Sequence, residues 1–180
     1  GLMYLSSVLT KAGLKTRILD ADVMAMTIDE TVEEIRTSPS RVVGISVMQR
    51  ALPSVKLLVE KIRERGITSH LCCGGFTATL SAKHILEKIP QIDSIVLGEG
   101  EEIFSELVNS LIENREWKGI PGTAYRGENG VVINPPAEKP EFACLDWPSR
   151  ELLEYCLGKT NYVTILGSRG CYGVCTFCSN

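Results

Sequence analysis

The sequence predicts an α/β protein in which a parallel β-sheet carries helices on both faces. Short, β-prone apolar runs alternate with amphipathic stretches of helical spacing, at intervals that suit βαβ units. One run, Val42–Val47, is continuously apolar except at Ser46, which is typical of a strand buried on both faces. Right-handed crossovers between such strands place helices on both sides of the sheet. The predicted architecture is therefore Rossmann-like (flavodoxin-like).

The expected elements begin and end at residues with recognised capping or breaking properties. Gly13 and Gly66 each follow a helical stretch, and Thr27 stands three residues before Glu30, the spacing of a capping box. We expect helices at Leu2–Ala12, Thr27–Arg36, Ser54–Arg65, Thr79–Ile89 and Glu101–Asn114. We expect strands at Thr16–Leu19, Val42–Val47, Thr68–Cys73 and Ser94–Leu97.

The pattern opens on a helix, whereas a doubly wound sheet opens on a strand that lies centrally. We therefore expect a first strand that lies upstream of residue 1 or is supplied by another segment.

The rhythm of the sequence changes after Trp117. The runs Thr123–Arg126 and Val131–Ile133 flank an Asn-Gly pair, the strongest short signal for a β-hairpin. Prolines then mark an extended linker, and a short helix is expected at Arg150–Leu157 before an apolar strand at Val163–Leu166. The predicted organisation is a domain at residues 1–117, a hairpin and linker at 118–146, and the start of a second, truncated domain at 147–180.

Composition excludes several classes of protein. The 180 residues are 44% hydrophobic and 23% charged with a net charge of −3, ordinary values for a globular domain. The basic residues are scattered, which speaks against a nucleic-acid or membrane-surface interface. No apolar run approaches the ~20 residues that cross a bilayer, and the N-terminal stretch lacks the basic region of a secretory signal. We expect a cytoplasmic protein.

Three cysteines near the C-terminus carry the strongest chemical signal. Cys171, Cys175 and Cys178 form a CxxxCxxC array directly after the last apolar run. Clustered thiolates bind soft metal centres, and three thiolates on a 4Fe-4S cubane leave one iron open to another ligand. A structural zinc site normally needs four ligands, and a set of inert buried thiols does not explain the spacing, but both alternatives stay open.

At these residues the chain resembles the radical S-adenosylmethionine (SAM) superfamily, with Phe177 as the aromatic residue before the last cysteine. The resemblance implies that Cys171, Cys175 and Cys178 ligate a 4Fe-4S cluster whose open iron binds SAM for reductive cleavage to a radical. It also implies a (β/α) barrel that starts with the strand at Val163–Leu166, an external electron donor such as flavodoxin or ferredoxin, and a small-molecule substrate. Because almost the whole barrel is absent, we expect no turnover by these 180 residues alone.

Upstream segments resemble the class of this superfamily that has an N-terminal cobalamin-binding domain. They are Gly1-Leu2-Met3-Tyr4-Leu5, Val43-Gly44-Ile45-Ser46-Val47-Met48, Gly74-Gly75-Phe76-Thr77-Ala78-Thr79 and Gly98-Glu99-Gly100-Glu101-Glu102. The class includes anaerobic Mg-protoporphyrin IX monomethyl ester cyclases and radical SAM methyltransferases. The resemblance implies methyl transfer or radical cyclisation with cobalamin.

The expected cobalamin-binding residues are Ser46, Met48, Gly74, Gly75 and Gly98. They follow successive parallel strands, where open α/β sheets bind ligands, and glycines let the backbone approach a bulky ligand. The competing interpretation is that the glycines only form turns and Ser46 only ends a strand. His70 and His84 lack the context of an axial cobalt ligand and are expected to be structural.

Two other functions remain compatible with the sequence. A methylthiotransferase-like radical SAM enzyme would not use its first domain for cobalamin, and a non-enzymatic corrinoid-binding module would not need the three cysteines.

Overall fold

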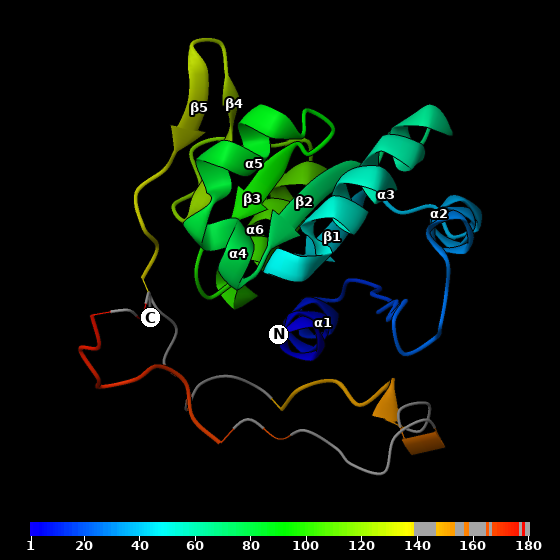
Figure 1. Ribbon diagram of the computed structural model, residues 1–180, viewed down its shortest axis with the longest axis horizontal. Helices are drawn as coiled ribbons and strands as arrows, with labels where there is room; N and C mark the ends of the chain where they lie inside the picture. Colours follow the sequence, from blue (N-terminus) through cyan, green and yellow to red (C-terminus); the bar gives the residue numbers. More distant parts are fainter. Residues whose placement is uncertain (139–146, 154–156, 159–164, 166, 177, 179–180) are drawn as a thin grey trace.

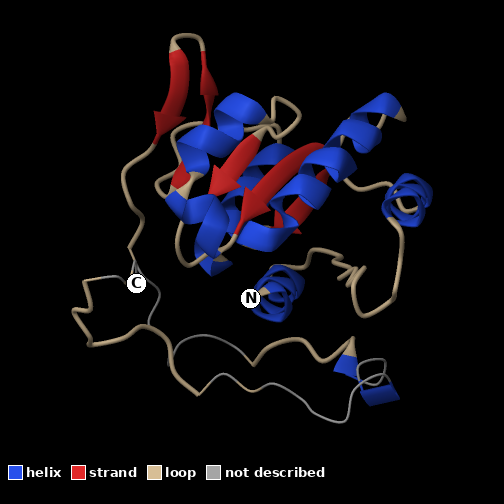
Figure 2. Ribbon diagram, in the orientation of Figure 1, coloured by secondary structure: helices blue, strands red, loops and turns tan. Residues whose placement is uncertain are grey.

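A five-stranded sheet organises the chain, and helices cover both of its faces (Figures 1 and 2). The computed structural model describes residues 1–138, 147–153, 157–158, 165, 167–176 and 178. The strands are β1 (Val42–Ser46), β2 (His70–Gly74), β3 (Ser94–Val96), β4 (Thr123–Gly127) and β5 (Gly130–Ile133), in that order across the sheet. The helices are α1 (Leu2–Lys11), α2 (Ile28–Thr37), the 3-10 turn η1 (Gln49–Ala51), α3 (Leu52–Glu64), α4 (Phe76–Leu80), α5 (Ala82–Lys88) and α6 (Glu101–Ile112).

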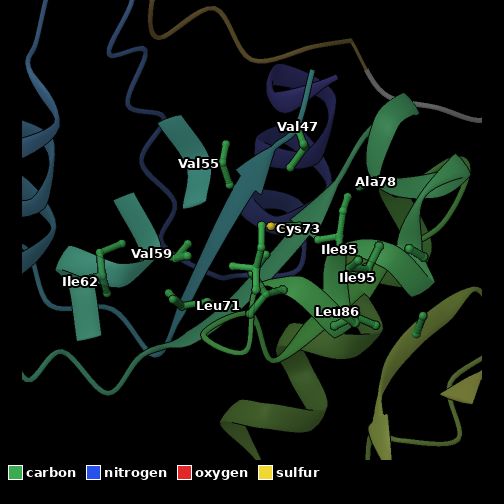
Figure 3. Close-up of a cluster of buried hydrophobic side chains, with 14 of the residues drawn as sticks. Val47, Val55, Val59, Ile62, Leu71, Cys73, Ala78, Ile85, Leu86 and Ile95 are labelled. Atoms are coloured by element: carbon green, nitrogen blue, oxygen red, sulfur yellow. The ribbon is translucent and has the colours of Figure 1, made fainter. Parts of the chain in front are cut away.

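One face of the sheet packs on α2, α3, α4 and α5. Alternation along β2 directs Leu71 and Cys73 to this side, where both are fully buried beside Ile95 of β3. Figure 3 shows these side chains meeting apolar residues from the helices, among them Val55, Val59, Ile62, Ile85 and Leu86. This cluster is the larger part of the hydrophobic core.

The opposite face packs on α6. Cys72 lies between Leu71 and Cys73 on β2, and its side chain points to the opposite face of the sheet. There it packs in a second cluster with Val96, Ile103 and Leu107. Helix α1 packs against α6. The predicted α/β class with helices on both faces is therefore confirmed.

Local signals in the sequence placed α2 correctly. Thr27 Oγ1 accepts a hydrogen bond from the Glu30 N–H at 3.2 Å, and the Thr27 N–H donates to Glu30 Oε2 at 2.8 Å. These reciprocal bonds are the predicted capping box, which satisfies donors that the first helical turn leaves unpaired.

The sheet is mixed rather than wholly parallel. β1, β2 and β3 are parallel, whereas β4 pairs antiparallel with β3 and turns back into β5 through the predicted Asn-Gly hairpin. Thr123 and Ala124 are completely buried, so the hairpin extends the sheet instead of standing apart from it. The boundaries of the predicted domains stay predictions.

Two predicted elements were wrong. Thr16–Leu19 forms no strand among the described residues, because β1 pairs only with β2 and the run has no neighbouring strand to bond its backbone. The expected single helix at Thr79–Ile89 is two shorter helices, α4 and α5, separated at Ser81, whose backbone leaves helical geometry with φ −120° and ψ 21°.

The predictions for the C-terminal part fall mostly outside the described residues. Of Val163–Leu166 only residue 165 is described, and the expected helix Arg150–Leu157 includes the undescribed residues 154–156. None of the helices in the described ranges combines the length and apolar character needed to cross a membrane.

Ile95 should be essential for the stability of this core. It is fully buried on β3, the central strand, so Ile95→Ala should lower the free energy of unfolding by about 2–5 kcal/mol through lost burial and a residual cavity. Ile133→Ala is the matched control, because Ile133 is 54% exposed on the edge strand β5. Urea unfolding followed by circular dichroism measures both; equal losses would contradict the assigned core.

Candidate functional site

The predicted ligand-binding residues meet at the carboxyl edge of the three parallel strands. Ser46, the last residue of β1, is in register with Gly74, the last residue of β2. The Val47 N–H donates to the Gly74 carbonyl at 2.8 Å, which holds the two strand ends together beyond the last pair. The structure thus brings Ser46, Gly74 and Gly75 together, and Gly98 leaves the same end of β3.

Gly75 adopts a conformation that favours glycine. Its φ is +97°, and a Cβ built there would lie 3.6 Å from Ser46 Oγ and 3.5 Å from the Val47 carbonyl oxygen. A side chain at residue 75 would therefore be strained and would stand over the end of β1. The glycine leaves the backbone at this edge open to a ligand.

The Gly98 loop is tied to the same edge through α4. Gly98 has a φ of +70°, and its N–H donates to Thr79 Oγ1 at 2.9 Å. Thr79 was not among the expected site residues, and its hydroxyl fixes the distance between α4 and the loop that follows β3.

Exposed apolar side chains follow the ends of β1 and β2. Met48, Phe76 and Leu80 are 64%, 53% and 53% exposed. Phe76 and Leu80 lie four residues apart on one face of α4, and Met48 immediately precedes η1. Such a surface beside exposed backbone and the Ser46 hydroxyl suits a large ligand with both apolar and polar parts. Phe76 and Leu80 were not among the predicted site residues. The available signals were the position of Phe76 directly after Gly74-Gly75 and its helical spacing to Leu80.

Both histidines lie away from this edge. His70 is the first residue of β2, four positions before Gly74; its Nε2 is 2.8 Å from Ser94 Oγ and its ring meets the edge of Trp117. Burial lowers the pKa of His70. His84 is exposed on α5.

A shallow depression of about 480 Å³ lies at the amino end of β2, beside Ser40, Gly66 and His70. It contains none of the predicted site residues.

The three C-terminal cysteines are exposed and free of disulfides. The Gly173 N–H donates to Cys171 Sγ at 3.3 Å, and a Cβ on Gly173 would lie 3.3 Å from Cys171 Sγ and 3.6 Å from Cys175 Sγ. Two of the sulfurs thus lie beside one glycine. Across the described ranges, however, no three His, Cys, Asp or Glu side chains are close enough to hold a metal ion, so Cys178 is not gathered with the other two. Three reduced, accessible thiols suit an iron–sulfur cluster as a donor set, and their role as ligands stays a prediction.

Cys72 and Cys73 belong to the core instead. Both are buried. Burial raises the pKa of the Cys72 thiol to about 12, and it also raises the pKa of the Cys73 thiol. Both remain protonated and unreactive at neutral pH.

Comparison with known families decides what kind of domain presents this edge. Residues 1–108 match the B12 binding domain. The chain belongs to the B12-binding domain family. This confirms the family expected from the four upstream segments.

Related proteins extend the similarity beyond the B12-binding domain. The chain is 31% identical, over all of its length, to a protein named an uncharacterized methyltransferase from Pyrococcus horikoshii. It is 32% identical, over 99% of its length, to the anaerobic magnesium-protoporphyrin IX monomethyl ester cyclase of a Synechocystis species. It spans 40% and 37% of the lengths of these two relatives.

Solved structures share the fold. The cobalamin-dependent S-adenosylmethionine radical enzyme OxsB, with aqua-cobalamin and SAM bound, superposes with a TM-score of 0.75 at 24% identity, over 87% of this chain and 22% of that one. The radical SAM methyltransferase TsrM from Kitasatospora setae, with cobalamin and a 4Fe-4S cluster bound, gives 0.68 at 24% identity, over 82% of this chain and 28% of that one.

The two sets of cysteines should differ in reactivity. Iodoacetamide at pH 8, under reducing and non-denaturing conditions, should alkylate Cys171, Cys175 and Cys178, because they are exposed and free. Cys72 and Cys73 should remain unmodified until the B12-binding domain is unfolded, because burial excludes the reagent and raises the pKa of both thiols. Peptide mass spectrometry measures this; rapid labelling of Cys72 in the folded protein would contradict the packing of β2.

Proposed function

We propose that this chain binds cobalamin at the carboxyl edge of β1, β2 and β3 and forms the N-terminal part of a cobalamin-dependent radical SAM enzyme. The observation that carries the proposal is the glycine-lined edge of a B12-binding domain, where Ser46 and Gly74 are in register and Gly75 keeps the backbone clear. The names of two relatives, a methyltransferase and a cyclase, support an enzyme, and the radical SAM enzymes OxsB and TsrM, which share the fold, were solved with cobalamin bound.

The edge offers a distinct role to each residue. Ser46 presents an exposed hydroxyl for hydrogen bonding, and Gly74, Gly75 and Gly98 let the main chain lie close to the ligand. The side chains of Met48, Phe76 and Leu80 pack against apolar parts of the corrinoid, and this contact removes all three from water.

Cys171, Cys175 and Cys178 would hold the 4Fe-4S cluster and leave one iron to bind SAM. When bound, the cluster supplies the electron that cleaves SAM, and the corrinoid supplies the methyl-transfer or radical chemistry. The chain contributes accessible thiols, and Gly173 places no side chain beside the sulfurs of Cys171 and Cys175.

The reaction is methyl transfer or radical cyclisation on a small molecule. A methyltransferase and a cyclase among the relatives support these two outcomes. A flavodoxin or ferredoxin is the proposed electron donor. The 180 residues alone would not turn over, because they span only about two fifths of those relatives.

Blocking the carboxyl edge should weaken cobalamin binding. Ser46→Phe in the full-length polypeptide places a ring over the ends of β1 and β2 and should raise the Kd for hydroxocobalamin roughly tenfold or more, by displacing ligand contacts. Ser40→Phe is the matched control, because Ser40 is exposed near the opposite end of β1. Titration followed by visible absorbance measures both.

The same titration separates the alternatives. Equal affinity in the two variants would place the corrinoid elsewhere. Absence of cobalamin binding in a wild-type protein that still assembles a cluster would favour a methylthiotransferase-like enzyme.

Replacing the three cysteines should abolish the cluster but not the corrinoid site. The triple variant carries Cys171→Ala, Cys175→Ala and Cys178→Ala. After anaerobic reconstitution it should lose the iron of the cluster (about 4 Fe per chain) and the visible absorbance of the cluster, because a cubane needs these thiolates as ligands. Cys72→Ala, which removes a buried core thiol, should retain the cluster. Full iron content in the triple variant would contradict the assignment of these three cysteines as the cluster ligands. Absence of the cluster in the reconstituted wild type would favour a corrinoid-binding module without a cluster.

A further inference from the structure

Arg169, two residues before Cys171, is seated against the loop that follows β3. Its guanidinium forms ion pairs with the carboxylates of Glu99 and Glu101, the latter at 2.6 Å between Nη2 and Oε1. The same group lies over the ring of Tyr4 on α1, 4.7 Å from the ring centroid. Arg169 therefore contacts two separate elements of the B12-binding domain through one rigid, planar group.

Burial makes this contact more than a surface ion pair. The Arg169 side chain is 16% exposed and that of Glu101 is 4% exposed, so water and salt screen the pair weakly. Among the described residues, Glu101 Oε2 is buried without a hydrogen-bond partner. The Glu101 carboxylate therefore depends on Arg169, and on its place at the first turn of α6, for compensation of its charge.

A second set of contacts brings the same C-terminal region to α1. The Ser149 N–H donates to the Met3 carbonyl at 2.9 Å, and Ser7 Oγ donates to the Trp147 carbonyl at 2.7 Å. Helix α1 in turn packs on α6. Trp147 and Ser149, before the undescribed residues 159–164, contact α1, and Arg169, after them, contacts α1 and the start of α6.

We infer that Arg169 is a positioning residue that anchors the cysteine segment to Glu99, in the loop after β3, and to Glu101, at the start of α6. The anchor would thereby set the cluster ligands against the carboxyl edge of β1, β2 and β3. The sequence places Gly98 next to Glu99 on one side of the ion pair, and Cys171 two residues beyond Arg169 on the other. One bridge therefore connects the two cofactor regions. The effect on the cofactors rests on the proposed function; the anchor itself does not.

Spin labels test the anchor without either cofactor. Tyr172→Cys and Glu106→Cys are introduced into the full-length polypeptide, with every other cysteine outside β2 replaced by serine; both positions are exposed. Pulsed electron paramagnetic resonance then measures the distances between the labels. The anchored protein should give one narrow distribution, which Arg169→Gln and Glu101→Gln should each broaden, with no further broadening in the double variant.

The controls separate the anchor from a general effect of charge or stability. Arg169→Lys should be intermediate, because a lysine ammonium cannot bridge two carboxylates as the guanidinium fork does. Arg115→Gln should leave the distribution unchanged, because Arg115 forms an ion pair with Glu113 that is exposed on both sides. An unchanged distribution in Arg169→Gln, or equal broadening by Arg115→Gln, would overturn the inference.

Cofactor binding provides the second measurement. In the full-length protein with its native cysteines, Arg169→Gln should raise the Kd for hydroxocobalamin about tenfold while iron content stays at the wild-type level, since the ligands remain. An unchanged affinity would overturn the link between the anchor and the carboxyl edge. Failure of the proposed function looks different, because the wild type itself would then bind no cobalamin.

Discussion

The parallel pairing of β1, β2 and β3 is the constraint on which the other features depend. Residues along β2 and β3 face one or other of two helical layers, so these two strands are mostly apolar on both sides, whereas β1 lies at the edge of the sheet and is only partly buried. The same pairing brings the three carboxyl ends to one edge. A shift of one residue between β1 and β2 would exchange the two faces of the core and separate Ser46 from Gly74.

The core and the carboxyl edge of the sheet impose opposite demands on neighbouring residues. Cys73 on β2 is fully buried in the larger hydrophobic cluster, whereas Gly75, two residues later, is exposed and carries no side chain. The chain changes within this short distance from close packing to an open backbone. Apolar residues that a core would enclose, Phe76 and Leu80, are instead left at the surface next to the edge. Their exposure suits a surface that a ligand covers.

Electrostatics decides how the C-terminal segment meets this domain. Glu101 lies at the start of α6, where a carboxylate is favourable, but it is too buried to be solvated by water alone. Arg169 provides the opposite charge from a distant part of the chain, and Tyr4 provides an aromatic face for it. Glu101, which is favourable at the start of α6, thereby also holds Arg169 and links the start of this helix to the cysteine segment.

The sequence by itself determined the features that depend on short-range patterns. The α/β class, the capping box of α2, the Asn-Gly hairpin and the carboxyl-edge position of Ser46 and Gly74 all follow from periodicity or from residues a few positions apart. Only the tertiary structure decided features that depend on distant partners: the unpaired state of Thr16–Leu19, the addition of β4 and β5 to the sheet, and the ion pairs of Arg169. The physical reason is that a strand needs a neighbour and a buried charge needs a counter-charge, and neither partner can be identified from the local sequence.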